Sequence, residues 1–427
     1  MAAPTPDTAN APGESAYRPT AGFVGLMGLM AALGAVTTDM YLPALPVIAA
    51  DLDTSPASVQ LTISATLLGA AVGQLVVGPL SDRFGRRRPA LVGIGVHVVT
   101  SIACIVAPSI GVLVALRVLQ GMGNSAAGVT AMATVRDRLS GGAAARVLSR
   151  LMLVLGVAPL LAPSIGGLIG GVVGWRGVFG ALALFGVVLF VVVWRYLPET
   201  LPPERRVARG AGVVVAGYRS LLTDRRFLAL AVLPGLAMGA ILAYVAAAPF
   251  VLQDGYGLDV HQFAVVFAVI GLGGTLVSQI NASLLGRWTP MAILRVALPG
   301  VVVLAAVLVA VVAAGATSLW ALLVPLWLVM SAVIFVPPNA SALALTRRGD
   351  RAGSAAALMG GLQVGTAAVV SALVGVLGGG ALAMAGVMLA VLLVALAVLA
   401  VGTSAYRRLP EPVPAPAVAC TGAVADG

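Results

Sequence analysis

Two charged residues interrupt apolar runs of this chain, and their positions make them the first candidates for chemistry. Asp39 lies in the segment TTDMYLPALP, and Arg117 lies in LRVLQGMGNSAAG. A charge near the centre of a bilayer costs about 3 to 10 kcal/mol, so such residues usually face a cavity or a partner. A buried carboxylate holds a proton more readily than one in water. Asp39 is therefore a candidate to carry a proton or to contact a cation.

Both residues also have a structural interpretation. Tyr41, Pro43 and Pro46 follow Asp39 directly, so its carboxylate could instead order a helix end or a loop. Arg117 could bond backbone carbonyls. A guanidinium does not release its proton, so we expect a functional Arg117 to lower the proton affinity of a carboxylate or to hold substrate oxygens.

The neighbours of Arg117 form a polar stripe. At helical spacing Arg117, Gly121, Asn124 and Gly128 share one face, and Gln120 lies beside it. The candidate residues for proton coupling and the substrate cavity are Asp39, Arg117, Gln120 and Asn124.

The ionisable residues exclude several activities. All 25 basic residues are arginine, so the chain has no lysine for a P-loop or a Schiff base. His97 and His261 are far apart, as are Cys104 and Cys420, which predicts neither a metal site nor a disulfide framework. His97 and Cys104, on one helical face, are interpreted as packing residues. We expect no cofactor, no metal and no enzymatic activity.

The composition is that of a membrane protein. Of 427 residues 60% are hydrophobic and only 9% are charged, against about 25% charged in soluble domains. Runs of about 20 apolar residues predict an all-α integral membrane protein with twelve transmembrane helices in two six-helix halves. The predicted spans lie near 22–42, 57–79, 89–107, 110–133, 149–170, 177–196, 227–250, 262–285, 291–313, 319–342, 354–376 and 381–403.

The spans divide the chain into five parts. We predict a disordered cytoplasmic tail over 1–21, a bundle over 22–196, a cytoplasmic linker over 197–226, a second bundle over 227–405 and a disordered cytoplasmic tail over 406–427. A weak sequence similarity between the segments that begin at Gly123 and Pro338 supports a repeat of six helices, with a central cavity between the halves.

The arginines predict the orientation. Between the predicted spans, 23 of the 25 lie on one side, while Arg176 lies on the other and Arg117 lies inside a span. The positive-inside rule places both termini in the cytoplasm. The net charge of +10 therefore reflects topology, and we expect no nucleic-acid partner.

The loop GPLSDRFGRRRPAL, residues 78–91, combines an acid, four arginines and two glycines. We expect Gly78 and Pro79 to end one helix and Gly85 to permit a tight reversal. We expect Asp82 to act as a cytoplasmic latch that accepts bonds from amides near Gly353 and Ser354 and from arginines such as Arg138. The candidate gating residues are Gly78, Asp82, Arg83, Gly85, Arg86 and Arg87.

This loop resembles the signature loop of the major facilitator superfamily. Residues 116–128 resemble the fourth-helix motif of its drug/proton antiporters, in which the arginine matching Arg117 is associated with proton coupling. Residues 156–171 resemble the fifth-helix antiporter motif, with Ala162-Pro163 where the family usually has Gly-Pro. In that helix we expect two prolines to bend the axis and two glycines to allow close packing. These are Pro159, Pro163, Gly166 and Gly167.

With TDMYLPALP (38–46) and LPET (197–200), the chain resembles the Bcr/CflA-type drug-resistance transporters. The resemblance implies a monomeric exporter in the bacterial cytoplasmic membrane that exchanges protons for a small lipophilic drug. A proton-coupled uptake symporter and a non-transporting receptor or scaffold remain as alternatives. The second half is generic, since its corresponding loop, 284–295, lacks the acid.

Overall fold

The computed structural model describes residues 19–139, 141–206, 211–315, 317–346 and 352–403, and these ranges are helical without any strand. The helices are α1 (Ala21–Asp39), α2 (Leu45–Asp51), α3 (Pro56–Phe84), α4 (Arg87–Ile105), α5 (Ile110–Arg138), α6 (Gly141–Tyr196), α7 (Ala211–Leu222), α8 (Arg225–Pro249), α9 (Val260–Leu284), α10 (Pro290–Ala313), α11 (Leu319–Ala332), α12 (Val336–Leu345), α13 (Ala352–Val376) and α14 (Ala381–Gly402). The short turns are η1 (Leu42–Ala44), η2 (Pro203–Arg205), η3 (Phe250–Gly255) and η4 (Val333–Phe335). The predicted tails, 1–21 and 406–427, lie almost wholly outside the described residues.

The structure accounts for twelve membrane crossings. Eleven described stretches are long and apolar enough to span a bilayer. One of them, Arg146–Tyr196, has 51 residues, which is far too long for a single pass through a core of about 30 Å at about 1.5 Å per residue. Its helix breaks at Gly174, whose φ of 73° is non-helical. Helix α6 therefore crosses twice, and the predicted all-α fold with twelve spans is confirmed.

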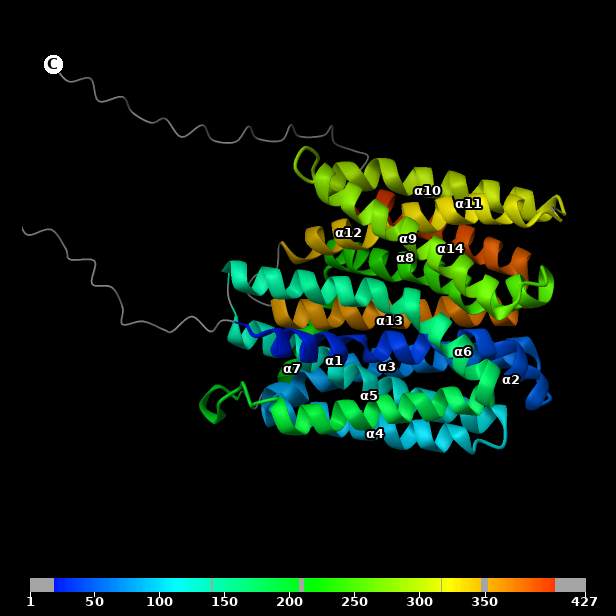
Figure 1. The fold of residues 1–427 in the computed structure, drawn as a ribbon. Helices are drawn as coiled ribbons and strands as arrows, with labels where there is room; N and C mark the ends of the chain where they lie inside the picture. Colours follow the sequence, from blue (N-terminus) through cyan, green and yellow to red (C-terminus); the bar gives the residue numbers. More distant parts are fainter. Residues whose placement is uncertain (1–18, 140, 207–210, 316, 347–351, 404–427) are drawn as a thin grey trace, which may run out of the picture.

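The spans run side by side as two groups (Figure 1). Helices α1 to α6 form one group and α8 to α14 form the other, while the predicted linker contains the short helix α7. Helix α13 packs along α3 of the first group and along α8 of its own group. The main seam between the groups therefore follows α3 and α13.

The prediction that Gly78 and Pro79 end a helix is wrong. Helix α3 continues through Pro79 to Phe84 and gains another turn that carries Asp82 and Arg83. Membrane helices tolerate an internal proline because neighbouring groups and waters satisfy the freed carbonyl. The reversal comes at Gly85, where φ is 89°, a value that favours glycine.

Glutamines of α3 rest against glycines of α13 and of the turn after it at the seam. A Cβ on Gly379 would lie 2.7 Å from Nε2 of Gln60, and a Cβ on Gly360 would lie 2.5 Å from Oε1 of Gln74. Such distances exclude a side chain at these glycines unless the glutamines move. The two groups thus touch closely from the first turns of α3 to Gln74.

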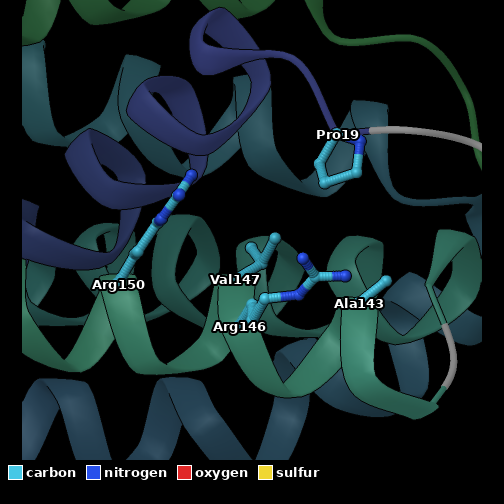
Figure 2. A pocket seen from close by; sticks show the side chains of 5 residues that line it. All are labelled: Pro19, Ala143, Arg146, Val147 and Arg150. Atoms are coloured by element: carbon cyan, nitrogen blue, oxygen red, sulfur yellow. The ribbon is translucent and has the colours of Figure 1, made fainter.

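A surface pocket of about 420 Å³ opens near the start of α6, at the end of the bundle that carries the 78–91 loop (Figure 2). Its lining comes from the segment just before α1 and from the first turns of α6. The residues are Pro19, Ala143, Arg146, Val147 and Arg150.

Candidate functional site

Arg117 is fully buried in α5 and spans the gap to the end of α1. Its Nη1 donates to Oε1 of Gln120 at 2.6 Å, and its Nη2 donates to the carbonyl of Thr37 at 3.2 Å. Thr37 lies in the last turn of α1, where carbonyls lack helical partners and the helix dipole favours a cation. Arg117 therefore caps α1 from a neighbouring helix.

Aromatic rings enclose the same guanidinium. Its Cζ lies 4.1 Å from the ring centroid of Tyr41 and 5.8 Å from that of Phe179. The Tyr41 hydroxyl in turn lies 2.7 Å from Oγ1 of Thr62 on α3. Cation–π contacts strengthen when water is excluded, so the rings stabilise a charge that the apolar surroundings would otherwise penalise.

A chain of hydrogen bonds leads from Arg117 to α4. Gln120 accepts from Arg117 and donates through Nε2 to Oγ of Ser101 at 2.7 Å. Ser101 donates to the carbonyl of His97, and Nε2 of His97 lies 3.1 Å from the carbonyl of Leu182 on α6. The chain therefore connects α1, α5, α4 and α6 through buried polar groups.

Asp39 is the last residue of α1 and follows Thr37, whose carbonyl Arg117 caps, by two positions. It is 8% exposed and makes no hydrogen bond or ion pair with any residue that the structure describes. Asp39 and Arg117 are therefore linked only through the end of α1, whose carbonyl Arg117 bonds, and they form no salt bridge. The carboxylate is left able to exchange a proton without first breaking a protein contact.

Asn124 lies one turn beyond Gln120 on α5 and is also buried. Among the described residues, no hydrogen bond of normal geometry reaches either polar atom of its side-chain amide, Nε of Arg117 or Nδ1 of His97, although the His97 ring and the Asn124 amide are close enough to interact. Unpaired buried polar atoms are costly, so each calls for a water, an ion or a ligand as partner. Of the four predicted cavity residues, Arg117 and Gln120 are hydrogen-bonded to each other and Asn124 lies beside His97, while Asp39 has no partner among the described residues.

The fifth-helix motif brings α6 close to both groups. A Cβ on Gly166 would lie 1.6 Å from the carbonyl oxygen of Met40, at the end of α1, and one on Gly167 would lie 2.3 Å from Val260 at the start of α9. Pro159 and Pro163 lie inside α6, as predicted. The two glycines therefore let α6 fit between α1 and the second group at the end opposite to the 78–91 loop.

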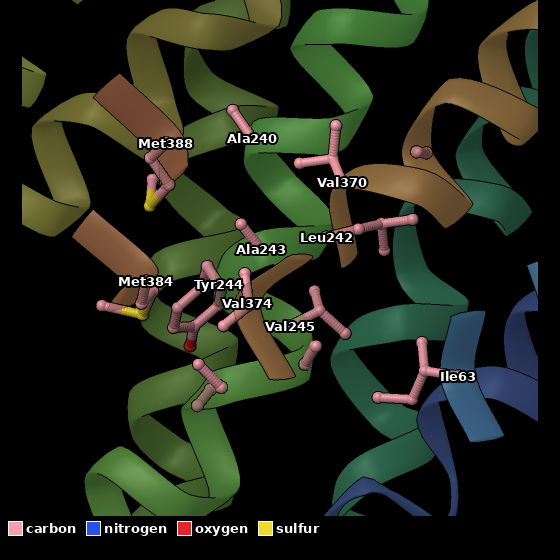
Figure 3. Packing of buried hydrophobic residues seen from close by; sticks show 14 of the residues in the cluster. Ile63, Ala240, Leu242, Ala243, Tyr244, Val245, Val370, Val374, Met384 and Met388 are labelled. Atoms are coloured by element: carbon pink, nitrogen blue, oxygen red, sulfur yellow. The ribbon is translucent and has the colours of Figure 1, made fainter. Parts of the chain in front are cut away.

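The second group is packed mainly with apolar side chains (Figure 3). Tyr244 of α8 stacks on Phe267 of α9 with centroids 5.6 Å apart, and its buried hydroxyl bonds no residue that the structure describes. One interhelical amide bond is present, from Nδ2 of Asn339 to Oδ1 of Asn281 at 2.7 Å. These asparagines head two glycosylation-like triplets in the sequence, and both are buried.

The 78–91 loop forms a cluster around Arg86 at the arginine-rich end. Arg86 donates to Asp82 and to Asp137, each at 2.7 Å, and to Ser81 at 3.0 Å. Burial lowers the pKa of Arg86, but its bonds to Asp137 and Asp82 outweigh that effect and raise it. Arg86 therefore ties the end of α3 to the end of α5.

Glu199 completes this cluster from beyond α6. It accepts from the amides of Arg86 at 2.8 Å and of Arg87 at 3.4 Å. Burial raises the pKa of Glu199, but these amide bonds, one from Leu201 and the charge of Arg206 bring it below its ordinary value. A Cβ at residue 85 would lie 2.2 Å from the Glu199 carboxylate, so Gly85 is needed for this contact.

The structure gives the expected latch a different partner. The Asp82 carboxylate bonds Arg86 of its own group rather than amides near Gly353 and Ser354. Part of the adjoining loop, 347–351, lies outside the described residues. In this conformation the cluster connects α3, α5 and the end of α6.

Sequence reasoning found the charges and missed most of their partners. His97 is interpreted above as packing, yet it is the end of the polar chain through Ser101. The aromatic partners of Arg117 and two of the acids around Arg86, Asp137 and Glu199, were not predicted, although Glu199 lies within the quoted LPET segment. In the described ranges, no three His, Cys, Asp or Glu residues gather as metal ligands would.

Comparison with known proteins identifies relatives over most of the chain. Residues 27–371 match the family model described as Major Facilitator Superfamily. The chain is 38% identical over 353 residues to a Bacillus subtilis (strain 168) protein described as uncharacterized MFS-type transporter YdgK, covering 82% of this chain and 88% of the relative. A Haemophilus influenzae protein named bicyclomycin resistance protein homolog is 30% identical, with coverage of 82% and 88%.

A third relative, named chloramphenicol resistance protein, comes from Pseudomonas aeruginosa and is 32% identical, covering 73% of each chain. Among solved structures, an inward-facing, occupied bacterial homologue of the human lysosomal transporter Spinster aligns with a TM-score of 0.70. It is 14% identical and covers 90% of this chain and 96% of its own, so it supports the fold alone.

Proposed function

The chain belongs to the major facilitator superfamily and is a multi-pass membrane protein with a small-molecule substrate, and from this premise we propose that it exports drugs in exchange for protons. The observation that carries the proposal is the arrangement at the end of α1. A fully buried arginine caps the helix, and two residues further on lies a buried carboxylate without a protein partner.

The chemistry of antiport favours this arrangement. An exporter must bind a proton from one side, release it to the other and make drug binding depend on that cycle. Asp39 supplies the carboxylate that titrates. Arg117 supplies a fixed positive charge that disfavours the proton on Asp39 when the two approach, and its free Nε can hold a substrate oxygen.

The substrate class is the part of the proposal supported by relatives. Two relatives are named for resistance to bicyclomycin and chloramphenicol, which are uncharged or weakly polar compounds. The second group is packed mainly with apolar side chains and presents few aromatic rings for cations. We therefore propose a small lipophilic antibiotic as the cargo.

The proposed working unit is a monomer in a bacterial cytoplasmic membrane. The bundles 22–196 and 227–405 rock about the central site, and the linker 197–226 and both termini lie in the cytoplasm. The arginines near Arg86 favour that orientation, since positive residues remain inside. At the other end Arg176 is paired with Asp51 at 2.5 Å, which reduces the cost of its placement outside.

Susceptibility testing and vesicle transport test the proposal together. An efflux-deleted bacterial strain that expresses the chain should become more resistant to one or more compounds of a panel that includes chloramphenicol and bicyclomycin. In proteoliposomes with an imposed proton gradient, the same compound should then move in the direction opposite to the flow of protons. Uptake with protons would instead support the symporter alternative, and no movement of any compound would support a receptor or scaffold.

A further inference from the structure

The pocket at the start of α6 contains two arginines and no acid (Figure 2). Arg146 and Arg150 are spaced at i and i+4, so both guanidinium groups project from one face of the helix. Both side chains are exposed. Arg150 makes no hydrogen bond or ion pair with any residue in the described ranges. The pocket therefore offers concentrated positive charge that the protein has not neutralised at Arg150.

The same face of α6 becomes apolar one turn further into the membrane. Leu153, Val157 and Leu161 continue the spacing of the arginines and are 66%, 40% and 54% exposed. From Arg150 to Leu161 the helix rises about 16 Å, which is close to the half-thickness of a bilayer core of about 30 Å. A phosphate group bound at the arginines would thus lie at one end of an exposed apolar stripe that is about as long as one leaflet is thick.

The pocket also has a wall that holds its shape. Val147 and Leu151 face α1 and are buried, and a Cβ on Gly28 of α1 would lie 3.3 Å from Val154. Pro19 closes the pocket just before α1 begins. The arginines are therefore mounted on a packed helix pair instead of a loop, which favours a defined site over a diffuse charged surface.

We propose that this pocket binds the phosphate headgroup of an anionic phospholipid from the cytoplasmic leaflet, with one acyl chain along Leu153, Val157 and Leu161. Basic pockets between transmembrane helices on the cytoplasmic side recognise such headgroups. A free phosphate would use the same arginines but not the apolar stripe. The site is separate from Asp39 and Arg117, so it does not depend on the proposed transport reaction.

Native mass spectrometry of the full chain in detergent tests the proposal. Phosphatidylglycerol, phosphatidylcholine with the same acyl chains, and inorganic phosphate are titrated in parallel. Phosphatidylglycerol should bind at least about tenfold more tightly than phosphatidylcholine. Equal binding of the two lipids would overturn the proposal. Displacement of phosphatidylglycerol by inorganic phosphate at similar affinity would show a soluble-anion site and would also overturn it.

Matched charge variants locate the site. The double change Arg146→Gln and Arg150→Gln should weaken phosphatidylglycerol binding about 30-fold. Arg225→Gln with Arg226→Gln removes two exposed arginines from the first turn of α8 and should change the affinity less than about twofold. Equal losses in both double variants would indicate general surface charge and contradict the pocket.

A conservative double substitution keeps the proposal testable if the glutamine variant unfolds. Arg146→Lys with Arg150→Lys keeps both charges and should retain phosphatidylglycerol binding within about threefold, because a phosphate accepts either cation. Thermal melting of every variant is measured alongside. If the folded lysine variant bound phosphatidylglycerol no more tightly than it binds phosphatidylcholine, that result would contradict a phosphate site.

Discussion

The two groups of helices bury polar side chains in different ways. In the described part of the chain, every charged residue that is buried lies in the first group, namely Asp39, Arg86 and Arg117. The second group buries an asparagine pair and single hydroxyl groups such as those of Tyr244 and Ser371. Buried charge is thus confined to the first group among the described residues, and the polar groups that the second group buries are neutral.

The largest effect is expected at Arg117. Arg117→Ala removes the cap on Thr37 and leaves Gln120 without its donor, at a cost of about 1–3 kcal/mol for each buried group left unpaired. Drug export should fall to background, and Arg117→Lys, which keeps the charge without the planar fork, should retain part of it. Transport rates normalised to the amount of folded protein provide the measurement. Wild-type export in the alanine variant would make Arg117 a structural residue.

The cluster around Arg86 should show the next largest effect. Asp137 is 19% exposed at its side chain and Asp82 is 55% exposed, while both accept from Arg86 at 2.7 Å. A less hydrated ion pair loses more when broken. Asp137→Asn should therefore slow export and lower the melting temperature more than Asp82→Asn does. The reverse order would indicate that Asp82 has a partner in another conformation, as the sequence predicts for the start of α13.

The contribution of Glu199 should depend on pH. Its pKa lies below the ordinary value of 4.5, so its charged form stabilises the folded state at neutral pH and loses that effect as pH falls through the lowered pKa. Glu199→Gln should lower the melting temperature at pH 7, and the gap from wild type should close in acid. A gap that stays constant from pH 7 to pH 3 would show that the charge of Glu199 is not what stabilises the cluster.

The smallest effect is expected in the second group. Asn339→Ala together with Asn281→Ala removes the interhelical amide bond and should cost about 0.6 kcal/mol, the average for such bonds in membranes. Export and proton coupling should persist. Loss of coupling in this variant, with folding intact, would show that the second group takes part in the ionic chemistry.

The fold was largely predictable, since the length of each apolar run can be read directly from the sequence. The apolar runs located the spans, and the break between 149–170 and 177–196 agrees with Gly174. The predicted helix end at Pro79 was wrong because proline ends helices more strictly in water than in a membrane, where α3 continues to Phe84.

The candidate site was predictable only in part. A charge within an apolar run is visible in sequence, so Asp39 and Arg117 were found. Their partners depend on packing between distant segments: Thr37 is 80 residues from Arg117, and Glu199 is 113 residues from Arg86. Local spacing carries no information about such contacts. The two partners at helical spacing, Gln120 for Arg117 and Asp82 for Arg86, were both among the candidate residues.

The central claim is that Asp39 carries the coupling proton, and drug-driven proton release tests it most directly. Proteoliposomes holding a pH-sensitive dye are exposed to the panel compound that the wild-type chain exports. The wild type should release protons on drug addition. Asp39→Asn, which removes the titrating group without breaking any described contact, should bind drug, melt near the wild-type temperature and release none. Proton release by the folded Asp39→Asn variant at the wild-type rate would contradict the claim.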